Sequence, residues 1–170
     1  ASFREIAPAL LFTAAVLNAV DKISQTNLPF LVAGEKGLGQ PYLSLLVHEA
    51  GFTKTEPFLE LHVRPNREQE SLDTLYALLL ADIPGQAFRG TLHIHGLENA
   101  SPRLQSALLH MLDEQKLLTE RNQFRFEGRI SASIHKTLDE IASQGVILHE
   151  LLCKLTIAPI LLKPLRERRK

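Results

Sequence analysis

The stretch Gly34–Gln40 (G-E-K-G-L-G-Q) has the outline of a loop that binds nucleotide phosphates, G-x-x-x-x-G-K-S/T. In that pattern backbone amides hold phosphate oxygens, the lysine neutralises the β- and γ-phosphates, and the hydroxyl helps to bind the metal. Here Gln40 replaces the lysine and Pro41 replaces the hydroxyl residue. The loop glycines remain, so backbone amides would still favour an anion at the start of a following helix.

A loop that still bound a nucleotide would use its own residues, and Lys36 is its alternative source of positive charge. The candidate nucleotide-binding residues are Gly34, Glu35, Lys36, Gly37, Gly39 and Gln40. Because a lysine in a loop more commonly faces solvent than a phosphate, we expect this set to be the relic of a binding site.

Two histidines form the second group that could do chemistry. His93 and His95 are two positions apart in a predicted strand, so their side chains lie on the same side, as metal ligands would. The remaining histidines complete no known ligand spacing; they stand at positions 48, 62, 110, 135 and 149. We therefore predict no metal site.

The composition is that of one ordinary globular domain covering residues 1–170, with zero formal net charge and 45% hydrophobic residues. A net charge of zero implies no general attraction to nucleic acid or membrane, and the basic run R-E-R-R-K at the end is typical of a solvated tail. The single cysteine, Cys153, excludes an internal disulfide and is expected to pack inside. No apolar run is long enough to cross a bilayer, so we expect a cytoplasmic protein.

Short apolar runs alternate with amphipathic stretches, which predicts an α/β fold with a five-stranded, mostly parallel sheet. The predicted strands are 29–33, 57–63, 90–95, 129–134 and 158–162. The predicted helices are 7–24, one beginning at Pro41, then 72–80, 101–114, 136–143 and 146–154. The glycine loop then lies at the carboxyl end of a strand and opens a helix, where anions bind in such sheets.

Three longer segments carry a resemblance to a known family. G-T-L-H-I-H-G-L-E-N-A-S-P-R-L-Q-S-A-L-L-H-M-L-D-E (Gly90–Glu114) resembles G-T-L-F-L-D-E-I-x-x-L-P-x-x-x-Q-x-x-L-L-x-x-L of the central AAA+ domain of bacterial enhancer-binding proteins, the activators of sigma-54 RNA polymerase. Arg129–Gly145 looks like the sensor strand of that family and the helix after it. Leu151–Arg168 is similar to its L-Y-Y-R-L-N-V-F-P-I-x-L-P-P-L-R-E-R signature. Together with the glycine loop, these blocks follow the family order over roughly residues 15–168.

The resemblance implies an AAA+, P-loop NTPase-like fold in three layers, ending before the helical lid and DNA-binding domain that usually follow. It also implies degenerate Walker A and Walker B motifs. The family's magnesium-binding aspartate and water-activating glutamate align with His95 and Gly96, which suit neither role. Glu98 follows two residues later, beyond the strand.

The other catalytic positions of the family also differ. The sensor position aligns with His135, a residue found there in some members, and the two arginine-finger positions align with Leu148 and Lys154. The segment 64–89 has no room for the G-A-F-T-G-A loop that contacts sigma-54, which places the chain with the shortened branch of the family. The lookalike G-Q-A-F-R-G at 85–90 is interpreted as a turn.

The resemblance therefore predicts a non-catalytic regulatory or oligomerisation domain of a bacterial transcription regulator, with no cofactor. Its partners would be proteins, including other copies of the chain, at the flanks of the domain. Sigma-54 contact is not expected, DNA binding would need a domain absent from this chain, and no membrane is involved. The alternative is a sensing module that binds ATP, another nucleotide or a second messenger in the old cleft without hydrolysis. An active ATPase would require both Lys36 and Glu98 to act as substitutes.

Overall fold

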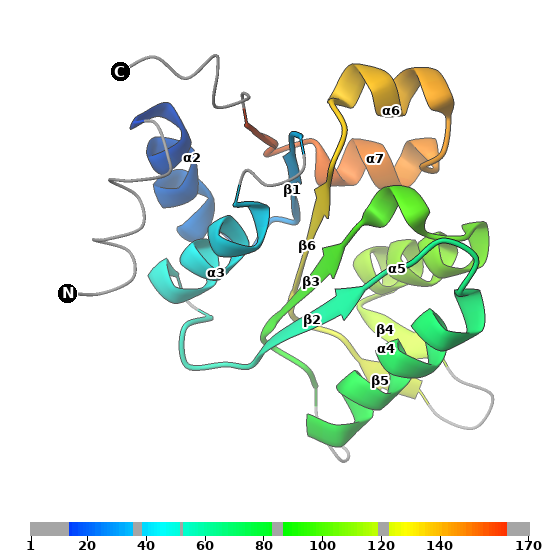
Figure 1. Ribbon diagram of the computed structural model, residues 1–170. Helices are drawn as coiled ribbons and strands as arrows, with labels where there is room; N and C mark the ends of the chain where they lie inside the picture. The colour runs from blue at the N-terminus through cyan, green and yellow to red at the C-terminus, as the bar shows by residue number, and fades with distance from the viewer. Residues whose placement is uncertain (1–13, 36–38, 52, 83–86, 119–122, 163–170) are drawn as a thin grey trace.

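The computed structural model describes residues 14–35, 39–51, 53–82, 87–118 and 123–162. These residues form a five-stranded sheet in the order β2-β3-β6-β1-β7, in which every neighbouring pair is parallel. A separate antiparallel pair is formed by β4 and β5. The elements, shown in Figure 1, are α2 (Ala14–Ser24), β1 (Phe30–Ala33), α3 (Gln40–Ala50), β2 (Phe58–His62), α4 (Glu68–Asp82), β3 (Thr91–His95), η1 (Leu97–Asn99), α5 (Pro102–Glu114), β4 (Lys116–Leu118), β5 (Gln123–Arg125), β6 (Arg129–Ile134), α6 (Leu138–Gln144), α7 (His149–Leu155) and β7 (Ile160–Leu161).

The five predicted strands of the parallel sheet are confirmed, within two residues at each end. The β4–β5 hairpin was not predicted, because the segment 116–125 contains no run of apolar residues long enough to mark a buried strand. The predicted helix 7–24 is confirmed from Ala14 onward, and residues 7–13 lie outside the described residues.

Local sequence explains several helix boundaries. The Ser101 side chain accepts a hydrogen bond from the Leu104 amide at the start of α5, and Pro102 occupies the first turn. Thr137 caps α6 in the same way, by accepting from the Glu140 amide. Helix α6 ends at Gly145, whose left-handed backbone (φ 63°) suits glycine.

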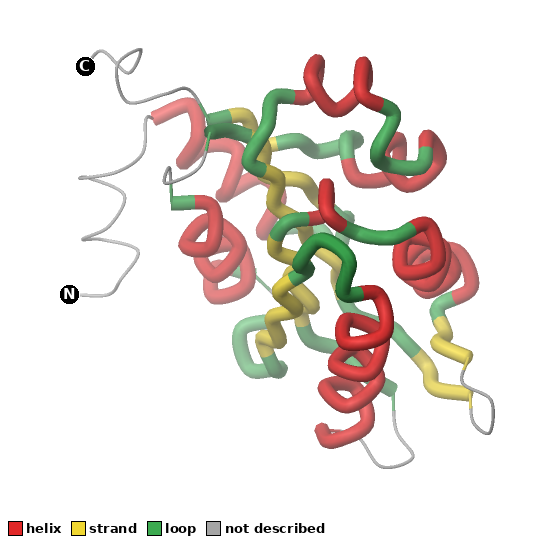
Figure 2. The backbone as a smooth tube through the Cα atoms, turned by 45° about the vertical axis from the view of Figure 1, so that its right-hand side comes forward, coloured by secondary structure: helices red, strands yellow, loops and turns green. Residues whose placement is uncertain are grey.

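Helices cover both faces of the sheet and leave it as the middle layer (Figure 2). One face packs against α4, α5 and α7 in a large apolar core, which includes Leu31, Leu61, Leu75, Leu92, Ile94, Leu104, Leu108, Ile130 and Leu151. On the other face, α2 and α3 form a smaller core with β1 and β7, which includes Val20, Phe30, Val32, Leu43, Leu46 and Ile160. Alternate strand residues supply the two cores, as the period of two requires.

The α3 face is polar where it crosses β3 and β6. Ser131 lies at the centre of this region: its hydroxyl is 2.6 Å from the Ser44 hydroxyl and 2.7 Å from Nδ1 of His93. Next to it, Nδ1 of His48 is 2.8 Å from the Thr91 hydroxyl. These buried hydrogen bonds fix α3 against the two strands.

A buried arginine fixes the turn that leads into β1. Arg129 is 2% exposed, lies over the Phe30 ring with 5.7 Å from its guanidinium carbon to the centroid, and donates to the carbonyls of Ile23 and Thr26. Burial lowers the pKa of Arg129 to about 10, so the guanidinium remains charged at neutral pH.

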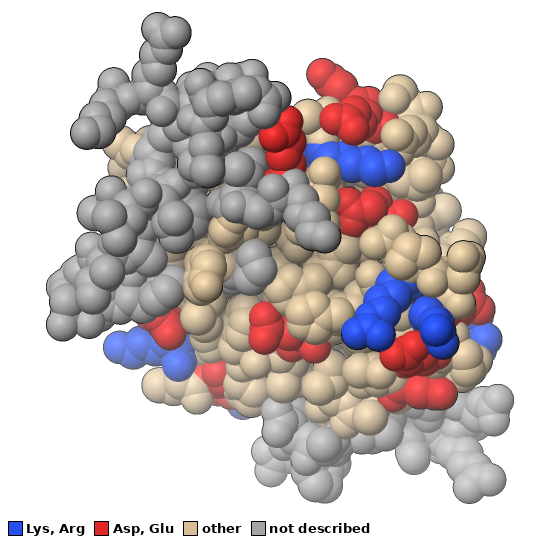
Figure 3. Space-filling model, in the orientation of Figure 1, with Lys and Arg blue, Asp and Glu red and all other residues tan. Residues whose placement is uncertain are grey.

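On the face in Figure 3, acidic and basic side chains are interspersed with uncharged surface. This mixture agrees with the neutral formal charge. Within the described part of the chain, none of the helices has the length and apolar character that spanning a bilayer would require.

Candidate functional site

The candidate site lies at the carboxyl edge of the parallel sheet, where β1, β3 and β6 end side by side. The Gly34 amide donates to the Ile134 carbonyl (3.4 Å), and the Gly96 amide donates to the Ser133 carbonyl (3.0 Å). The loop after β1 and the turn after β3 are therefore both held against the end of β6. The sheet thus brings together the loop, the end of β3 and the sensor position.

The described part of the glycine loop is shaped as a strand-to-helix turn. Gly34 is buried, and Gly39 adopts a left-handed backbone (φ 87°, ψ 24°) immediately before α3. Glycine adopts this conformation without strain, which explains its presence there. Glu35 is exposed, whereas Lys36 and Gly37 lie outside the described residues.

The Gln40 side chain is held by the backbone of its own loop. It is 1% exposed, and its Nε2 donates to the carbonyl of Gly34 (3.1 Å) and to the carbonyl of Glu35 (2.9 Å). The amide group thus faces back onto the beginning of the loop and uses both of its N–H donors on the backbone. A neutral side chain bound in this way supplies no charge to an anion.

The end of β3 carries an imidazole, that of His95. His95 is paired in register with His62 of β2, and its Nε2 is 2.9 Å from Oε1 of Glu60. The His62 and His95 rings are stacked, with centroids 4.2 Å apart and planes 3° apart. Burial lowers the pKa of His95, although the hydrogen bond to Glu60 opposes the shift.

His93 lies on the same face as His95, as predicted, but deeper in the sheet. It is fully buried, its ring meets that of His95 edge to face, and its Nε2 has no hydrogen-bond partner among the described residues. Burial lowers the pKa of His93 well below the usual histidine value, so the ring is neutral at pH 7. Its hydrogen bond with Ser131 belongs to the polar contacts that hold α3 against β3 and β6.

Gly96 follows with a backbone that suits few other residues. Its φ is 77°, and a Cβ built there would lie 3.1 Å from the Val63 carbonyl oxygen and 3.1 Å from Nδ2 of Asn99. A longer side chain at position 96 would therefore be strained by both conformation and contact.

Glu98 and His135 meet across the sheet edge. Oε2 of Glu98 accepts a hydrogen bond from the His135 backbone amide (2.7 Å), while Oε1 is buried with no partner among the described residues. The His135 side chain itself is exposed. Glu98 thus ties the turn after β3 to the end of β6.

Leu148 and Lys154 lie apart from this edge, at the two ends of α7. Leu148 precedes the helix, is 37% exposed, and donates its backbone amide to Oε1 of Gln105 (2.7 Å). Nζ of Lys154 is 2.5 Å from Oδ1 of Asp113 in α5, a contact that raises the pKa of Lys154.

On the same helix Cys153 is exposed, so the expected internal packing of this cysteine is wrong. Its position faces solvent although two leucines, Leu151 and Leu152, precede it.

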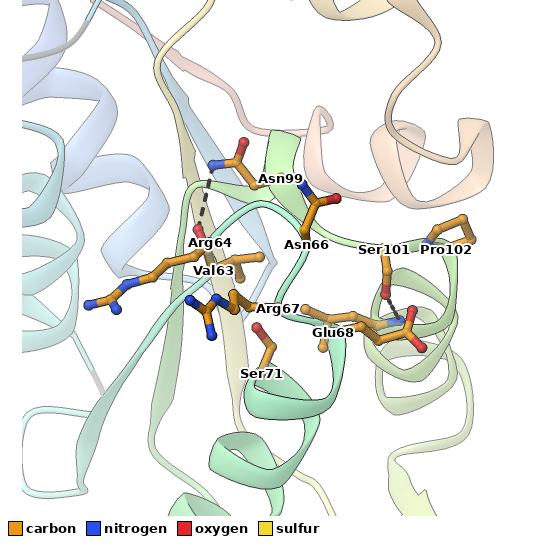
Figure 4. Close-up of a pocket in the computed structure, with 10 residues that line it drawn as sticks. Val63, Arg64, Asn66, Arg67, Glu68, Ser71, Asn99, Ser101 and Pro102 are labelled. Carbon is orange, nitrogen blue, oxygen red and sulfur yellow. Dashed lines mark hydrogen bonds between the residues drawn. The ribbon is translucent and has the colours of Figure 1, made fainter.

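A pocket of about 580 Å³ opens beside the site, between the starts of α4 and α5 (Figure 4). It is lined by Val63, Arg64, Asn66, Arg67, Glu68, Ser71, Asn99, Ser101, Pro102 and Leu104. The Asn99 side chain donates to the Val63 carbonyl at 3.5 Å. Its lining includes no described residue of the glycine loop, so this hollow is separate from the predicted nucleotide site.

Sequence reasoning missed Glu60 as a candidate. The signal was present in the letters F-L-E-L-H of β2, because two polar residues alternate with leucines in a strand of a mostly buried sheet. The position of β2 next to β3, which puts Glu60 beside His95, could not be read from this local pattern.

Comparisons with known proteins identify the family of the chain. The profile of the sigma-54 interaction domain matches residues 11–165. A Nif-specific regulatory protein of Bradyrhizobium diazoefficiens is 26% identical over 167 residues, covering 91% of this chain and 29% of that protein. The chain therefore spans less than a third of that relative.

Solved structures show the same fold. NtrX from Brucella abortus, in complex with ATP, matches with a TM-score of 0.69 and 17% identity over 95% of this chain and 39% of that chain. The P-loop NTPase domain of a sigma-54 transport activator from E. coli matches with a TM-score of 0.62 and 19% identity over 89% of this chain and 94% of that chain. At such identities the likeness establishes the AAA+ fold and nothing about activity.

Proposed function

Because the chain belongs to the sigma-54 interaction domain family, we propose that it is a regulatory and self-association domain of a bacterial transcription regulator that has lost ATPase activity. The curated relative named above is a regulatory protein, which supports the regulatory part. The loss of ATPase activity is argued from the side chains at the sheet edge.

The observation that carries the proposal is the position of Gln40. Phosphoryl transfer needs a cation at this place in the loop to neutralise the phosphates. The Gln40 amide is uncharged, buried, and bound to the carbonyls of Gly34 and Glu35. The charge is thus missing, and the side chain that replaces it is committed to the loop itself.

The end of β3 supports the same conclusion. Magnesium prefers oxygen ligands, whereas His95 offers a ring nitrogen that is already hydrogen-bonded to Glu60. Gly96 cannot activate water, and its left-handed backbone disfavours any replacement that could. The residues at the end of β3 therefore do not fit a magnesium–nucleotide centre that hydrolyses ATP. Glu98, the alternative base, is bonded to the His135 amide.

Self-association is supported by apolar side chains that flank α7. Ile157 and Leu161 are 66% and 56% exposed, and Val146 and Leu148 are also exposed. Leu161 belongs to β7, which is an edge strand of the sheet. Exposed apolar side chains before and after one helix offer surface for protein–protein contact. Lys154 of α7 forms an ion pair with Asp113 of the same chain.

Two measurements on the purified chain test the proposal. First, phosphate release from ATP with magnesium should not exceed the background of a heat-denatured sample. Release above background that disappears in Lys36→Ala would show that the loop is an active site after all.

Second, sedimentation velocity over a wide concentration range should show self-association without any nucleotide. Ile157→Glu should shift the distribution to smaller species, whereas Thr55→Glu, a change at an exposed polar residue outside this flank, should leave it unchanged. A monomer at every concentration would contradict the self-association part.

The backbone of the loop favours a second candidate, a sensing module that binds a nucleotide without hydrolysis. Gly39 keeps the turn that opens α3, and this N-cap glycine makes no side-chain capping hydrogen bond. The NtrX neighbour was solved with ATP, which makes ATP a sensible first probe. Calorimetric titration with ATP, ADP and cyclic dinucleotides decides between the two: saturable binding that is lost in Gly39→Val favours the sensor, and no heat favours the scaffold.

A further inference from the structure

We propose that Glu60, His62 and His95 form a binding site for a divalent transition-metal ion, with zinc as the best-matched cation. The site lies at the carboxyl ends of β2 and β3 and goes beyond the regulatory function proposed above. It revises the expectation, drawn from spacing along the chain alone, that the histidines hold no metal.

The strand register brings the three side chains together. His62 and His95 are partners in the parallel β2–β3 pair, so they lie at the same height on the same face. Glu60 is two residues before His62 and therefore shares that face. Two strands that are 33 residues apart in sequence, from His62 to His95, thus contribute one cluster.

The distances are close to those of a coordination shell. One ligand atom from each residue can be chosen so that all three lie within 4.8 Å of one another, and Nε2 of His95 is 2.9 Å from Oε1 of Glu60. Zinc binds imidazole nitrogen at about 2.0–2.1 Å and carboxylate oxygen at about 2.0–2.2 Å, which puts tetrahedral ligand atoms about 3.3 Å apart. Small rotations of the exposed Glu60 and His62 side chains would close the remaining gap.

The donor set also indicates which ion would bind. Two imidazoles and one carboxylate suit zinc and its neighbours in the first transition row, whereas magnesium and calcium prefer oxygen alone. The partly buried His95 would be the fixed ligand, because its ring meets buried His93 edge to face. Glu60 and His62 are exposed, so a water molecule has access to the fourth position.

The other explanation of this cluster is a simple hydrogen bond between Glu60 and His95, beside an exposed histidine. In that arrangement the His62 ring stacks on His95 with the planes 3° apart, and the in-plane nitrogen lone pairs of such parallel rings do not converge on one ion. Metal binding therefore requires the exposed His62 ring to rotate, after which a metal that bridges the strands would use all three residues. It would stabilise the β2–β3 edge, because a ligand that binds only the folded state shifts the folding equilibrium.

The test is calorimetric titration of the chelator-treated chain with zinc chloride. We expect one zinc ion per chain, and a 100-fold shift of the folding equilibrium toward the native state when free zinc is 100 times Kd. Cobalt titration gives an independent signal, since visible absorption bands appear when Co²⁺ enters a tetrahedral site.

Three variants locate the ion. His95→Gln and His62→Gln should each weaken zinc binding at least about tenfold, since loss of an outer-shell partner alone typically costs 10- to 100-fold. His149→Gln is the matched control, because His149 is an exposed histidine 3.5 Å from Cys153 and offers a rival thiol–imidazole pair. His62 is exposed, so its variant should fold even if His95→Gln does not.

The outcomes are distinct. Tenfold weaker binding in the His62 and His95 variants, with the His149 variant unchanged, supports the site. Unchanged affinity in His62→Gln, no zinc binding by the native chain, or a loss that follows His149→Gln overturns it.

Discussion

Replacing Gln40 tests whether its side chain stabilises the loop rather than binding a ligand. Gln40→Ala removes two hydrogen bonds from the amide to the carbonyls of Gly34 and Glu35. A neutral intramolecular hydrogen bond contributes about 0.5–1.5 kcal/mol net, so the pair is worth roughly 2 kcal/mol. For a domain of this size each kcal/mol lowers Tm by about 2–4 °C, which gives a loss of about 4–8 °C.

Gln40→Glu should destabilise the fold more than Gln40→Ala. A carboxylate has nearly the same size but donates no hydrogen bond when ionised, so it would place a negative charge against two carbonyl oxygens in a buried position. The expected order of stability is therefore native, then the alanine variant, then the glutamate variant. Free energies of unfolding from urea titration, with thermal melts as a second readout, give the ranking.

Gln69 provides the matched control, because its Nε2 donates to Asp73 one turn along the exposed face of α4. Such a pair contributes only about 0.2–0.5 kcal/mol, so Gln69→Ala should lower Tm by less than about 2 °C. If Gln40→Ala costs no more than Gln69→Ala, or Gln40→Glu is as stable as the native chain, the assignment of Gln40 to the loop is refuted.

Three further predictions concern the polar interior and the turns. Ser131→Ala should cost about 1–3 kcal/mol in unfolding free energy, because two hydrogen bonds to its hydroxyl are lost. Ser133→Ala should be nearly neutral, because its buried hydroxyl has no partner among the described residues. Equal unfolding free energies for the two variants would contradict this prediction. Gly96→Ala should cost more unfolding free energy than the roughly 1–2 kcal/mol expected of Gly145→Ala. Both glycines have positive φ, but only at Gly96 would a Cβ contact neighbouring atoms closely. Thermal melts that rank the two variants the other way would count against the turn geometry. Stability should fall as pH drops below about 6.5, by at most about 1.4 kcal/mol per pH unit from His93, because burial lowers the folded pKa of this ring and the unfolded chain therefore binds protons first. Urea titrations at pH 7.5 and 5.5 measure this loss, and a His93→Gln variant with the same pH slope would show that the ring is not its source.

Much of the fold could be predicted from local patterns. Runs such as Phe30–Ala33 and Arg129–Ile134 were recognisable as buried strands, and Pro41 marked the helix after the loop. These features depend on residues close in sequence, whose spacing sets the period of two or 3.6 that each element requires. The short β4–β5 hairpin lacked such a signal, because strands of three residues have too few positions to show a period.

The sequence by itself determined that a glycine turn follows a buried strand, and its resemblance to the family predicts that Gln40, His95 and Gly96 stand where the family has its phosphate- and metal-binding residues. Only the tertiary structure decided what these residues contact. The Gln40 amide binds the loop carbonyls, and Glu60 and His62 join His95, because β2 is the neighbour of β3 in the sheet. Sequence spacing specifies the face of a strand on which a side chain lies, but the neighbour and register of that strand follow from packing of the whole chain.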